Sequence, residues 1–230
     1  MTPAHQLETL YDGRFSKNAT YRARVWDVLV REYFQQFVPR DARVLDLGCG
    51  YGQFINTIVA REKCAMDLNP RAAKLVEPGV TFFLSDCAER WPLDDGALDV
   101  VFTSNLLEHL ADKAAVQRTL REAVRALAPG GTLICLGPNL HYLNGAYWDF
   151  WDHRVALTDR SLREILDLSG FRVERIVPRF LPYTMADGKQ PPIALVRAYL
   201  RLPWAWPLIG RQFLIVARSS TRSTSFAPSE

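Results

Sequence analysis

Hydrophobic and polar positions follow a helical spacing in three parts of the chain. Over residues 20–37, apolar side chains recur every three or four positions with arginines and glutamates between them, which predicts a helix ended by Pro39. The same spacing returns over residues 112–128, with one continuous apolar face. A third such segment, residues 158–169, is closed by Gly170 and is also expected to be helical.

Short apolar runs bounded by turn residues predict strands between these helices. They lie at residues 43–47, 64–68, 80–84, 98–103, 132–136, 171–177 and 213–217. Because strands and helices alternate, the pattern predicts an α/β fold, with a mostly parallel sheet covered by helices on both faces. Right-handed crossovers make such a sheet doubly wound and Rossmann-like, and we expect its last strand to run antiparallel.

The same pattern suggests three parts of the chain. Residues 1–40 are predicted to be an N-terminal helical cap, residues 41–218 the main domain, and residues 219–230 a flexible tail rich in Ser and Thr. Two stretches interrupt the alternation within the main domain. Residues 138–157 are rich in aromatic side chains, and residues 178–210 in proline and tryptophan. Long connections in compact domains are often functional, which makes both insertions candidates for substrate contacts.

Composition excludes several classes of function. The net charge of +3 and the absence of a Lys/Arg-rich block disfavour a nucleic-acid partner. The cysteines are scattered without metal-ligand spacing, which indicates a reducing compartment and gives no reason to expect a metal. No apolar run has the length of a transmembrane helix, and the first residues do not read as a secretory signal. We therefore expect a cytoplasmic protein.

A glycine-rich loop after the first strand is the strongest chemical signal. Gly48, Gly50 and Gly52 allow the backbone to turn sharply and to approach a ligand closely, and the helix predicted after them offers free N–H groups. Asp67 ends the second strand, where a carboxylate can accept hydrogen bonds from ribose hydroxyls. Asp86 follows the third strand, where it can accept from an adenine amino group. The pattern therefore predicts an adenosine-containing cofactor.

These motifs together resemble those of class I S-adenosylmethionine-dependent methyltransferases, in particular the type 11/12-like domains. The similar segments appear in the family's order, at residues 44–52, Asp67, 85–87, 103–110 and 127–133. The resemblance covers roughly residues 40–137 and continues more weakly through residues 158–177. It implies that residues 41–218 form a methyltransferase domain, with S-adenosyl-L-methionine as cofactor and S-adenosyl-L-homocysteine as product.

The resemblance also implies which residues bind the cofactor. They are Asp46, Gly48, Cys49, Gly50, Gly52, Asp67, Leu68, Asp86, Cys87, Ser104 and Asn105. The first five would hold the methionine part, the next two the ribose and adenine, the following two the adenine edge, and the last two the sulfonium end. Purely structural roles stay open for the aspartates as caps or turn residues, and for the cysteines as small buried side chains.

A base is the next requirement, because a hydroxyl acceptor usually loses its proton during methyl transfer. His109 follows the fourth strand, His141 follows the fifth, and His153 lies beside Asp152, which can orient an imidazole. Each histidine has a structural alternative as a backbone partner or a loop residue. The aromatic side chains of residues 147–151 either form an acceptor wall or attach the loop to the core.

O-methylation of a small-molecule or glycan acceptor is the leading functional hypothesis. A similarity of residues 145–184 to methyltransferases of bacterial polysaccharide assembly favours the glycan. Two alternatives are a non-catalytic S-adenosylmethionine-binding partner subunit and a nicotinamide-dependent oxidoreductase. Gln53 stands where a dinucleotide fingerprint needs its third glycine and argues against the oxidoreductase. Residues 192–210 are an acceptor lid, a homodimer surface, a peripheral membrane contact or a buried helix.

Overall fold

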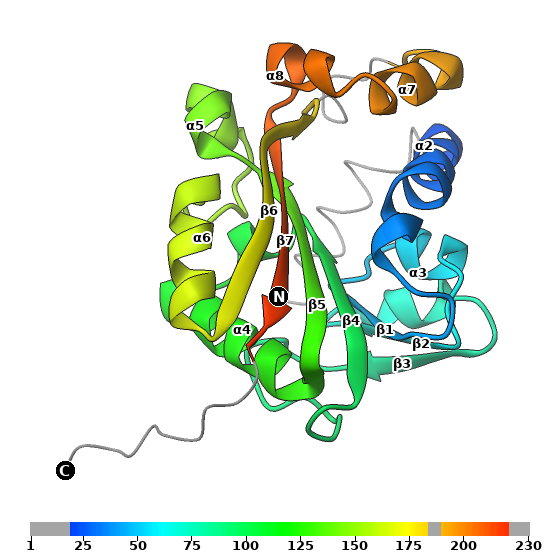
Figure 1. Cartoon of the computed structure of the whole chain (residues 1–230), viewed down its shortest axis with the longest axis vertical. Helices are drawn as coiled ribbons and strands as arrows, with labels where there is room; N and C mark the ends of the chain where they lie inside the picture. The colour runs from blue at the N-terminus through cyan, green and yellow to red at the C-terminus, as the bar shows by residue number, and fades with distance from the viewer. Residues whose placement is uncertain (1–18, 184–189, 221–230) are drawn as a thin grey trace.

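A single seven-stranded sheet forms the centre of the molecule. The computed structural model describes residues 19–183 and 190–220 (Figure 1). The strands are β1 (Arg43–Leu47), β2 (Glu62–Asp67), β3 (Val80–Leu84), β4 (Leu98–Ser104), β5 (Leu127–Pro138), β6 (Phe171–Leu181) and β7 (Gln212–Ser219). Their order is β3-β2-β1-β4-β5-β7-β6, and β7 is antiparallel to both of its neighbours while β1 to β5 pair in parallel. The predicted α/β class and the antiparallel last strand are confirmed.

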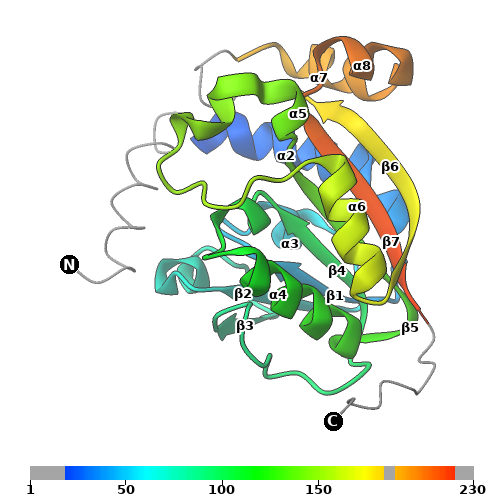
Figure 2. The same ribbon diagram turned by 90° about the vertical axis from the view of Figure 1, so that its left-hand side faces the viewer.

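Helices cover both faces of this sheet, as predicted. The α-helices are α2 (Ala19–Glu32), α3 (Gln53–Thr57), α4 (Lys113–Ala126), α5 (Leu140–Leu143), α6 (Asp159–Leu168), α7 (Ile193–Leu200) and α8 (Trp206–Ile209). Short 3-10 helices are η2 (Phe34–Phe37), η3 (Pro70–Lys74), η4 (Leu107–His109), η5 (Asn144–Asp149) and η6 (Pro203–Ala205). Figures 1 and 2 show α4 and α6 on one face, with α2 and α3 on the other.

Alternating side chains of the strands fill two hydrophobic cores. In β1, Leu45 and Leu47 belong to the core beneath α4 and α6, whereas Val44 belongs to the core beneath α2. A strand buried on both faces has no polar alternation, which is why it reads as a continuous apolar run. Parallel pairing then aligns the carboxyl ends of β1, β2 and β4, with Leu47 opposite Met66 and Thr103. Loops that follow these strands therefore meet at one edge.

Capping residues explain where the amphipathic helices begin. Asp112 accepts a hydrogen bond from the backbone N–H of Ala115 at 2.7 Å and starts α4. Thr158 and Ser161 form a reciprocal capping box that starts α6. Each interaction satisfies N–H groups that lack a partner within the first helical turn.

Several element boundaries differ from the sequence expectation, and two of them have a clear physical reason. The predicted helix over residues 20–37 ends at Glu32 and continues only as the separate 3-10 helix η2. The predicted break at residues 129–131 instead lies within the longer strand β5, where Gly130 adopts a φ of +75°. Glycine permits this left-handed conformation inside a strand, so Pro129-Gly130-Gly131 is an irregularity of the strand and not its end.

Both insertions form short helices at the carboxyl edge of the sheet. The first contains α5 and η5 and connects β5 to α6, and the second contains α7, η6 and α8 and connects β6 to β7 (Figures 1 and 2). Arg179 bridges them, because its guanidinium lies 5.0 Å from the ring centroid of Tyr142 while its Nε donates to the carbonyl of Gly210 at 2.8 Å. The two insertions are thus connected to each other through Arg179 at the carboxyl edge of the sheet.

The segment over residues 192–210 has a buried side and an exposed side. Trp206 packs on Phe180 and Tyr33, with ring centroids 5.0 and 5.7 Å apart. Leu195, Trp204, Leu208 and Ile209 are exposed. The buried-helix alternative therefore holds for one face only.

Some sequence predictions fall outside the described residues. These are the first part of the N-terminal cap, at residues 1–18, and nearly all of the predicted flexible tail, at residues 221–230. Among the described residues, no helix combines the length and apolar character needed to cross a bilayer. The cytoplasmic location and the homodimer stay predictions.

Candidate active site

The glycine-rich loop is attached to the end of β2 by its backbone. The N–H groups of Gly48 and Cys49 donate to the carbonyl of Met66 at 2.8 and 3.2 Å. Gly48 and Gly50 have φ values of +73° and +50°, which disfavour any side chain. A Cβ on Gly48 would lie 2.9 Å from Leu106, whereas a Cβ on Gly50 would meet nothing within 4 Å. Gly48 therefore serves close packing, and Gly50 faces open space.

Asp67 holds this loop through its carboxylate. Oδ2 accepts from the N–H of Gly50 and Oδ1 from the N–H of Asn69, both at 2.8 Å. Burial raises the pKa of Asp67, while these backbone N–H groups oppose that shift. Each carboxylate oxygen has a second lone pair, so Asp67 can still accept two hydroxyl groups. The following residue, Leu68, leaves half of its surface exposed at this edge.

Asp46 lies beneath the loop and is buried. It accepts a hydrogen bond from the backbone N–H of Ile55 in α3, and burial raises its pKa to about 8, with a further contribution from the charge of Asp67. This contact is the capping role that the sequence left open. Cys49 and Cys87 are also buried, and burial raises the pKa of the Cys87 thiol to about 11. A thiol of that pKa is a packing group and not a nucleophile at neutral pH.

Three further predicted cofactor residues lie at the ends of neighbouring strands: Asp86 shortly after β3, and Ser104 and Asn105 at the end of β4. Asp86 is exposed, and its Oδ1 accepts from the N–H of Ala88 at 2.8 Å, as a turn cap does. Asn105 adopts a φ of +50° and donates through Nδ2 to the Ser104 hydroxyl at 2.8 Å. The N–H of Asn105 donates to the carbonyl of Leu136, which fixes this turn between β4 and β5. All three side chains lie at the carboxyl edge, and their contact with a cofactor stays a prediction.

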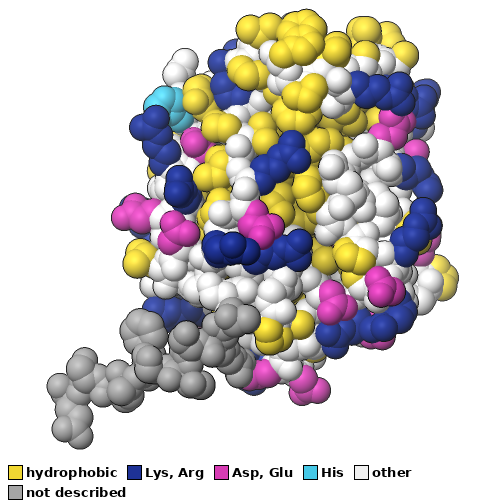
Figure 3. Space-filling model, viewed as in Figure 1, with side chains coloured by type: hydrophobic (Ala, Val, Ile, Leu, Met, Phe, Trp, Pro, Cys, Tyr) yellow, Lys and Arg dark blue, Asp and Glu magenta, His cyan; other side chains and the backbone are white. Residues whose placement is uncertain are grey.

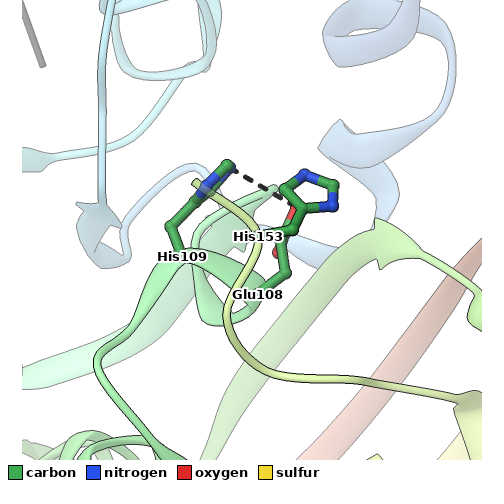
Figure 4. Close-up of side chains that lie close together, drawn as sticks. All are labelled: Glu108, His109 and His153. Carbon is green, nitrogen blue, oxygen red and sulfur yellow. Dashed lines mark ion pairs between the residues drawn. The ribbon is translucent and has the colours of Figure 1, made fainter. Parts of the chain in front are cut away.

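A second group of polar side chains lies where the first insertion crosses η4. Glu108 and His109 come from η4, and His153 comes from the insertion (Figure 4). One potential ligand atom from each residue lies within 4.8 Å of the other two. The N–H groups of Arg154 and Val155 donate to the carbonyl of Glu108 at 2.8 and 3.0 Å. Backbone hydrogen bonds therefore fix the insertion on η4 and set the position of His153.

Asp152 determines which nitrogen of His109 carries the proton. Nδ1 lies 3.2 Å from the carbonyl oxygen of Asp152 and 3.3 Å from its Oδ2, and both atoms are acceptors. Nδ1 must then be the donor, which leaves the lone pair on Nε2. Nε2 lies 3.9 Å from Oε1 of the buried Glu108, whose pKa is raised by burial and lowered by His109. The sequence placed Asp152 beside His153, whereas the structure shows it orienting His109.

The aromatic cluster divides into two roles. Tyr147 and Phe150 pack on His153, with ring centroids 4.7 and 5.1 Å apart, and Tyr147 donates to the carbonyl of Val155. These two residues attach the loop to the core. Trp148 and Trp151 are exposed, Trp151 to 90%, and are therefore available to a ligand.

The three histidines proposed from the sequence do not form one group. His109 and His153 lie together, with ring centroids 4.8 Å apart. His141 is exposed on α5, where its ring lies beside Tyr142. Sequence reasoning missed Glu108, although it directly precedes a histidine after a predicted strand and that pair was a usable signal. No local sequence pattern indicated that Glu108 would lie close to His153, which is 45 positions away in the chain.

Comparisons with known proteins point to one family. A protein-family model described as a methyltransferase domain matches residues 19–176. A Mycobacterium tuberculosis protein named "Probable S-adenosylmethionine-dependent methyltransferase Rv3030" is 38% identical over 113 residues, which cover 46% of this chain and 40% of that protein. The chain thus spans about two fifths of that relative's length.

Two further similarities concern an acceptor and a partner. The ajmaline N-methyltransferase of Rauvolfia serpentina is 35% identical over 112 residues, covering 43% of this chain and 36% of that protein. A Haloferax volcanii methyltransferase solved in complex with the activator Trm112 matches with a TM-score of 0.66 and 18% identity. The match covers 90% of this chain and 95% of that one, which shows a shared fold.

Proposed function

This chain belongs to the class I S-adenosylmethionine-dependent methyltransferases, and from that membership we propose that it methylates a hydroxyl group of a small-molecule or glycan acceptor. S-adenosylmethionine supplies an activated methyl group, so the protein's main tasks are alignment and exclusion of water. The observation that carries the hydroxyl assignment is the close pair of His109 and His153 at the edge where the glycine loop lies. Membership of the methyltransferase family sets aside the nicotinamide-dependent alternative.

The residues at the carboxyl edge fit this cofactor. Gly50 faces open space, so the backbone of the loop can lie against a ligand. The carboxylate of Asp67 is held in place by two N–H donors and retains lone pairs for the ribose hydroxyls. Leu68 offers an exposed apolar side chain at the position expected to pack on adenine. Asp46 is better placed to support the loop than to touch the ligand.

A hydroxyl acceptor explains the histidine pair better than an acceptor that needs no base. The acceptor oxygen attacks the methyl carbon, the C–S bond breaks with its electron pair going to sulfur, and the hydroxyl proton must leave. Nε2 of His109 is the lone-pair nitrogen that would take this proton, because Asp152 holds the proton on Nδ1. His153 shares the same space and comes from the insertion that would contact the acceptor.

The second candidate acceptor is an amine, because the Rauvolfia relative is named as an N-methyltransferase. A different alternative is that the chain needs a partner subunit or has a non-catalytic role, since the Haloferax neighbour was solved with an activator subunit. An uncharged amine carries its own lone pair and needs less help from a base than a hydroxyl does. Neither alternative accounts for an Asp152-oriented imidazole beside a second histidine.

The exposed face of the α7–α8 segment supports a further part of the proposal, namely contact with an anionic membrane surface. Figure 3 shows hydrophobic side chains gathered over these helices, with basic side chains nearby. Residues 190–211 contain no Asp or Glu and include Arg197, Arg201 and Arg211, although Glu32 of α2 pairs with Arg197 and Arg201 at 2.6 and 3.2 Å. Exposed tryptophan and leucine side chains bordered by arginines favour an interfacial contact with an anionic lipid surface.

Methyl-transfer assays on a panel of sugars, phenols and amines test the proposed acceptor class. We expect transfer to a hydroxyl, with His109→Asn and His153→Asn each lowering kcat by about 100-fold or more while binding of S-adenosylhomocysteine is unchanged. His141→Asn is the matched control and keeps wild-type kcat. Transfer only to amines, or full kcat in both variants, contradicts the proposal; cofactor binding without any transfer favours the partner-dependent role.

A further inference from the structure

We propose that Glu108, His109 and His153 bind one divalent transition-metal cation of the zinc class at the acceptor edge of the sheet. The three side chains come from two segments that meet only in the folded chain, η4 and the first insertion (Figure 4). Residue spacing alone does not predict this metal site, because two of the three ligands are adjacent in the chain and the third is remote. The binding claim stands alone, whereas the catalytic role described below rests on the proposed O-methylation.

The distances fit a site that closes slightly around an ion. Potential ligand atoms of the three residues lie within 4.8 Å of one another, and Nε2 of His109 is 3.9 Å from Oε1 of Glu108. Zinc holds nitrogen and oxygen ligands at about 2.0–2.2 Å, which places two ligands of a tetrahedral site about 3.4 Å apart. The Glu108–His109 pair is therefore about 0.5 Å too wide, and the limit of 4.8 Å for the whole group is about 1.4 Å above the ideal separation, so the side chains must rotate toward the ion to bind it.

The donor set selects the class of cation. Two imidazoles and one carboxylate suit zinc and its neighbours among the transition metals, whereas magnesium and calcium prefer oxygen ligands throughout. Three protein ligands also leave a fourth position of a tetrahedral site open, which is the arrangement of catalytic rather than structural zinc.

The surroundings of the ligands support the same assignment. Asp152 accepts from Nδ1 of His109 and so turns the Nε2 lone pair toward Glu108, which is the carboxylate–histidine–metal relation found around bound zinc. Glu108 is only 2% exposed, and a carboxylate buried to this extent is stabilised by an adjacent cation. Tyr147 and Phe150 pack on the ring of His153 and hold it in position.

A cation at this position changes how the acceptor hydroxyl is activated. With the ring nitrogens of His109 and His153 acting as ligands, the cation replaces the imidazole as the activating group. It binds the hydroxyl oxygen in the open position and lowers the pKa of that hydroxyl, so the proton passes to water. The oxygen then attacks the methyl carbon and the C–S electron pair goes to sulfur, giving the methyl ether and S-adenosylhomocysteine.

Titration of chelator-treated full-length protein with Zn²⁺ alone tests the binding claim without any acceptor. We expect one Zn²⁺ per chain in the wild type and in His141→Asn, and at least about 100-fold weaker binding in Glu108→Gln and His153→Asn. Asp152→Asn, which replaces the carboxylate beside Nδ1 of His109, should weaken binding about 10- to 100-fold. Normal binding of S-adenosylhomocysteine shows that each variant is folded.

Three results would overturn the metal site. One is a wild type that binds S-adenosylhomocysteine but not Zn²⁺, and another is Zn²⁺ binding unchanged in Glu108→Gln and His153→Asn. The third is a thiolate charge-transfer band with Co²⁺, because it would assign the metal to cysteine.

Methyl transfer measured with and without bound Zn²⁺ separates the metal site from the proposed function. We expect transfer to hydroxyls to fall on metal removal and to return on reloading. Transfer that is independent of metal, with Zn²⁺ still bound by Glu108 and His153, overturns the catalytic role of the cation and leaves His109 as the base. Failure of the proposed O-methylation itself would instead appear as cofactor binding without any hydroxyl product, whatever the metal content.

Discussion

The cofactor edge and the acceptor edge of this molecule are adjacent but are built differently. At the cofactor edge, the N–H of Gly48 donates to the carbonyl of Met66 and the N–H of Gly50 donates to the carboxylate of Asp67, so the loop after β1 is held on the end of the neighbouring parallel strand β2. At the acceptor edge, Glu108 and His153 come from segments 45 positions apart, and Arg179 joins one insertion to the other. The donor site is thus defined by the sheet, whereas the acceptor site is defined by how the insertions pack on it.

This difference suggests how members of such a fold can share a donor and differ in acceptor. Changes in the insertions can move His153 or Trp151 without disturbing the strands that hold the loop. Function then follows from the groups placed on the scaffold and not from the scaffold alone. If the two edges are separable in this way, variants at one edge should leave binding at the other intact.

The largest expected effect comes from Asp67→Ala. This change removes the carboxylate that accepts from Gly50 and that is expected to accept from the ribose, and hydrogen bonds to charged groups are worth about 1.5–3 kcal/mol each. We expect binding of S-adenosylhomocysteine, measured by isothermal titration, to weaken by about 100-fold or more. Zn²⁺ binding at Glu108 and His153 should be unchanged.

Asp86→Ala is the matched control for that prediction. Asp86 also follows a strand at this edge, but its side chain is exposed and caps its own turn through Ala88. We expect at most about a tenfold loss of affinity, because an exposed hydrogen bond contributes about 0.5–1.5 kcal/mol. Equal losses in the two variants would mean that Asp67 has no special role, and a loss of Zn²⁺ binding in Asp67→Ala would mean that the two edges are coupled.

The cofactor edge could be predicted from sequence because its signals are local. Strands β1 and β4 are buried on both faces and so form apolar runs, and the loop residues follow their strands directly. Parallel pairing then brings Asp67 to the loop without further information. The sequence left a capping role open for Asp46, but it could not identify the partner, which the structure shows to be the backbone N–H of Ile55 in α3.

The acceptor edge could be predicted only in part, because its contacts are long-range. The sequence correctly indicated that residues 138–157 and 178–210 interrupt the alternation, and it named both histidines of the pair. It could not show that the backbone of Arg154 would bond to Glu108 and bring the insertion onto η4. That contact decides which carboxylate orients which imidazole, so the pairing of Asp152 with His109 was available only from the fold.

A smaller effect is expected at the exposed face of the α7–α8 segment. Leu208→Asp should weaken co-sedimentation with vesicles containing phosphatidylglycerol by about tenfold, because burying a leucine side chain contributes about 1.5–3 kcal/mol. Leu168→Asp is the matched control, since Leu168 on α6 is 70% exposed and Leu208 is 68% exposed. Cofactor binding should be unaffected in both variants. Equal vesicle binding in the two variants, or none in the wild type, contradicts the membrane contact.

The last effect concerns the buried support of the cofactor edge and is read from the pH dependence of stability. Burial raises the pKa of Asp46 in the folded chain to about 8, whereas an aspartate in the unfolded chain has a pKa of about 3.9. Between these values the folded state holds a proton that the unfolded state has lost, so the free energy of unfolding falls as pH rises. The slope from this one group is at most about 1.4 kcal/mol per pH unit.

Asp46→Asn removes the titration while keeping an oxygen that can accept from Ile55. Urea unfolding of both proteins at pH values between 5 and 8 should therefore show the wild type losing stability relative to Asp46→Asn, with the difference levelling off above about pH 8. Parallel curves would mean that Asp46 is ionised and solvated beneath the loop. The support of the cofactor edge would then be as open to water as the acceptor edge, and the contrast between the two would rest on Asp67 alone.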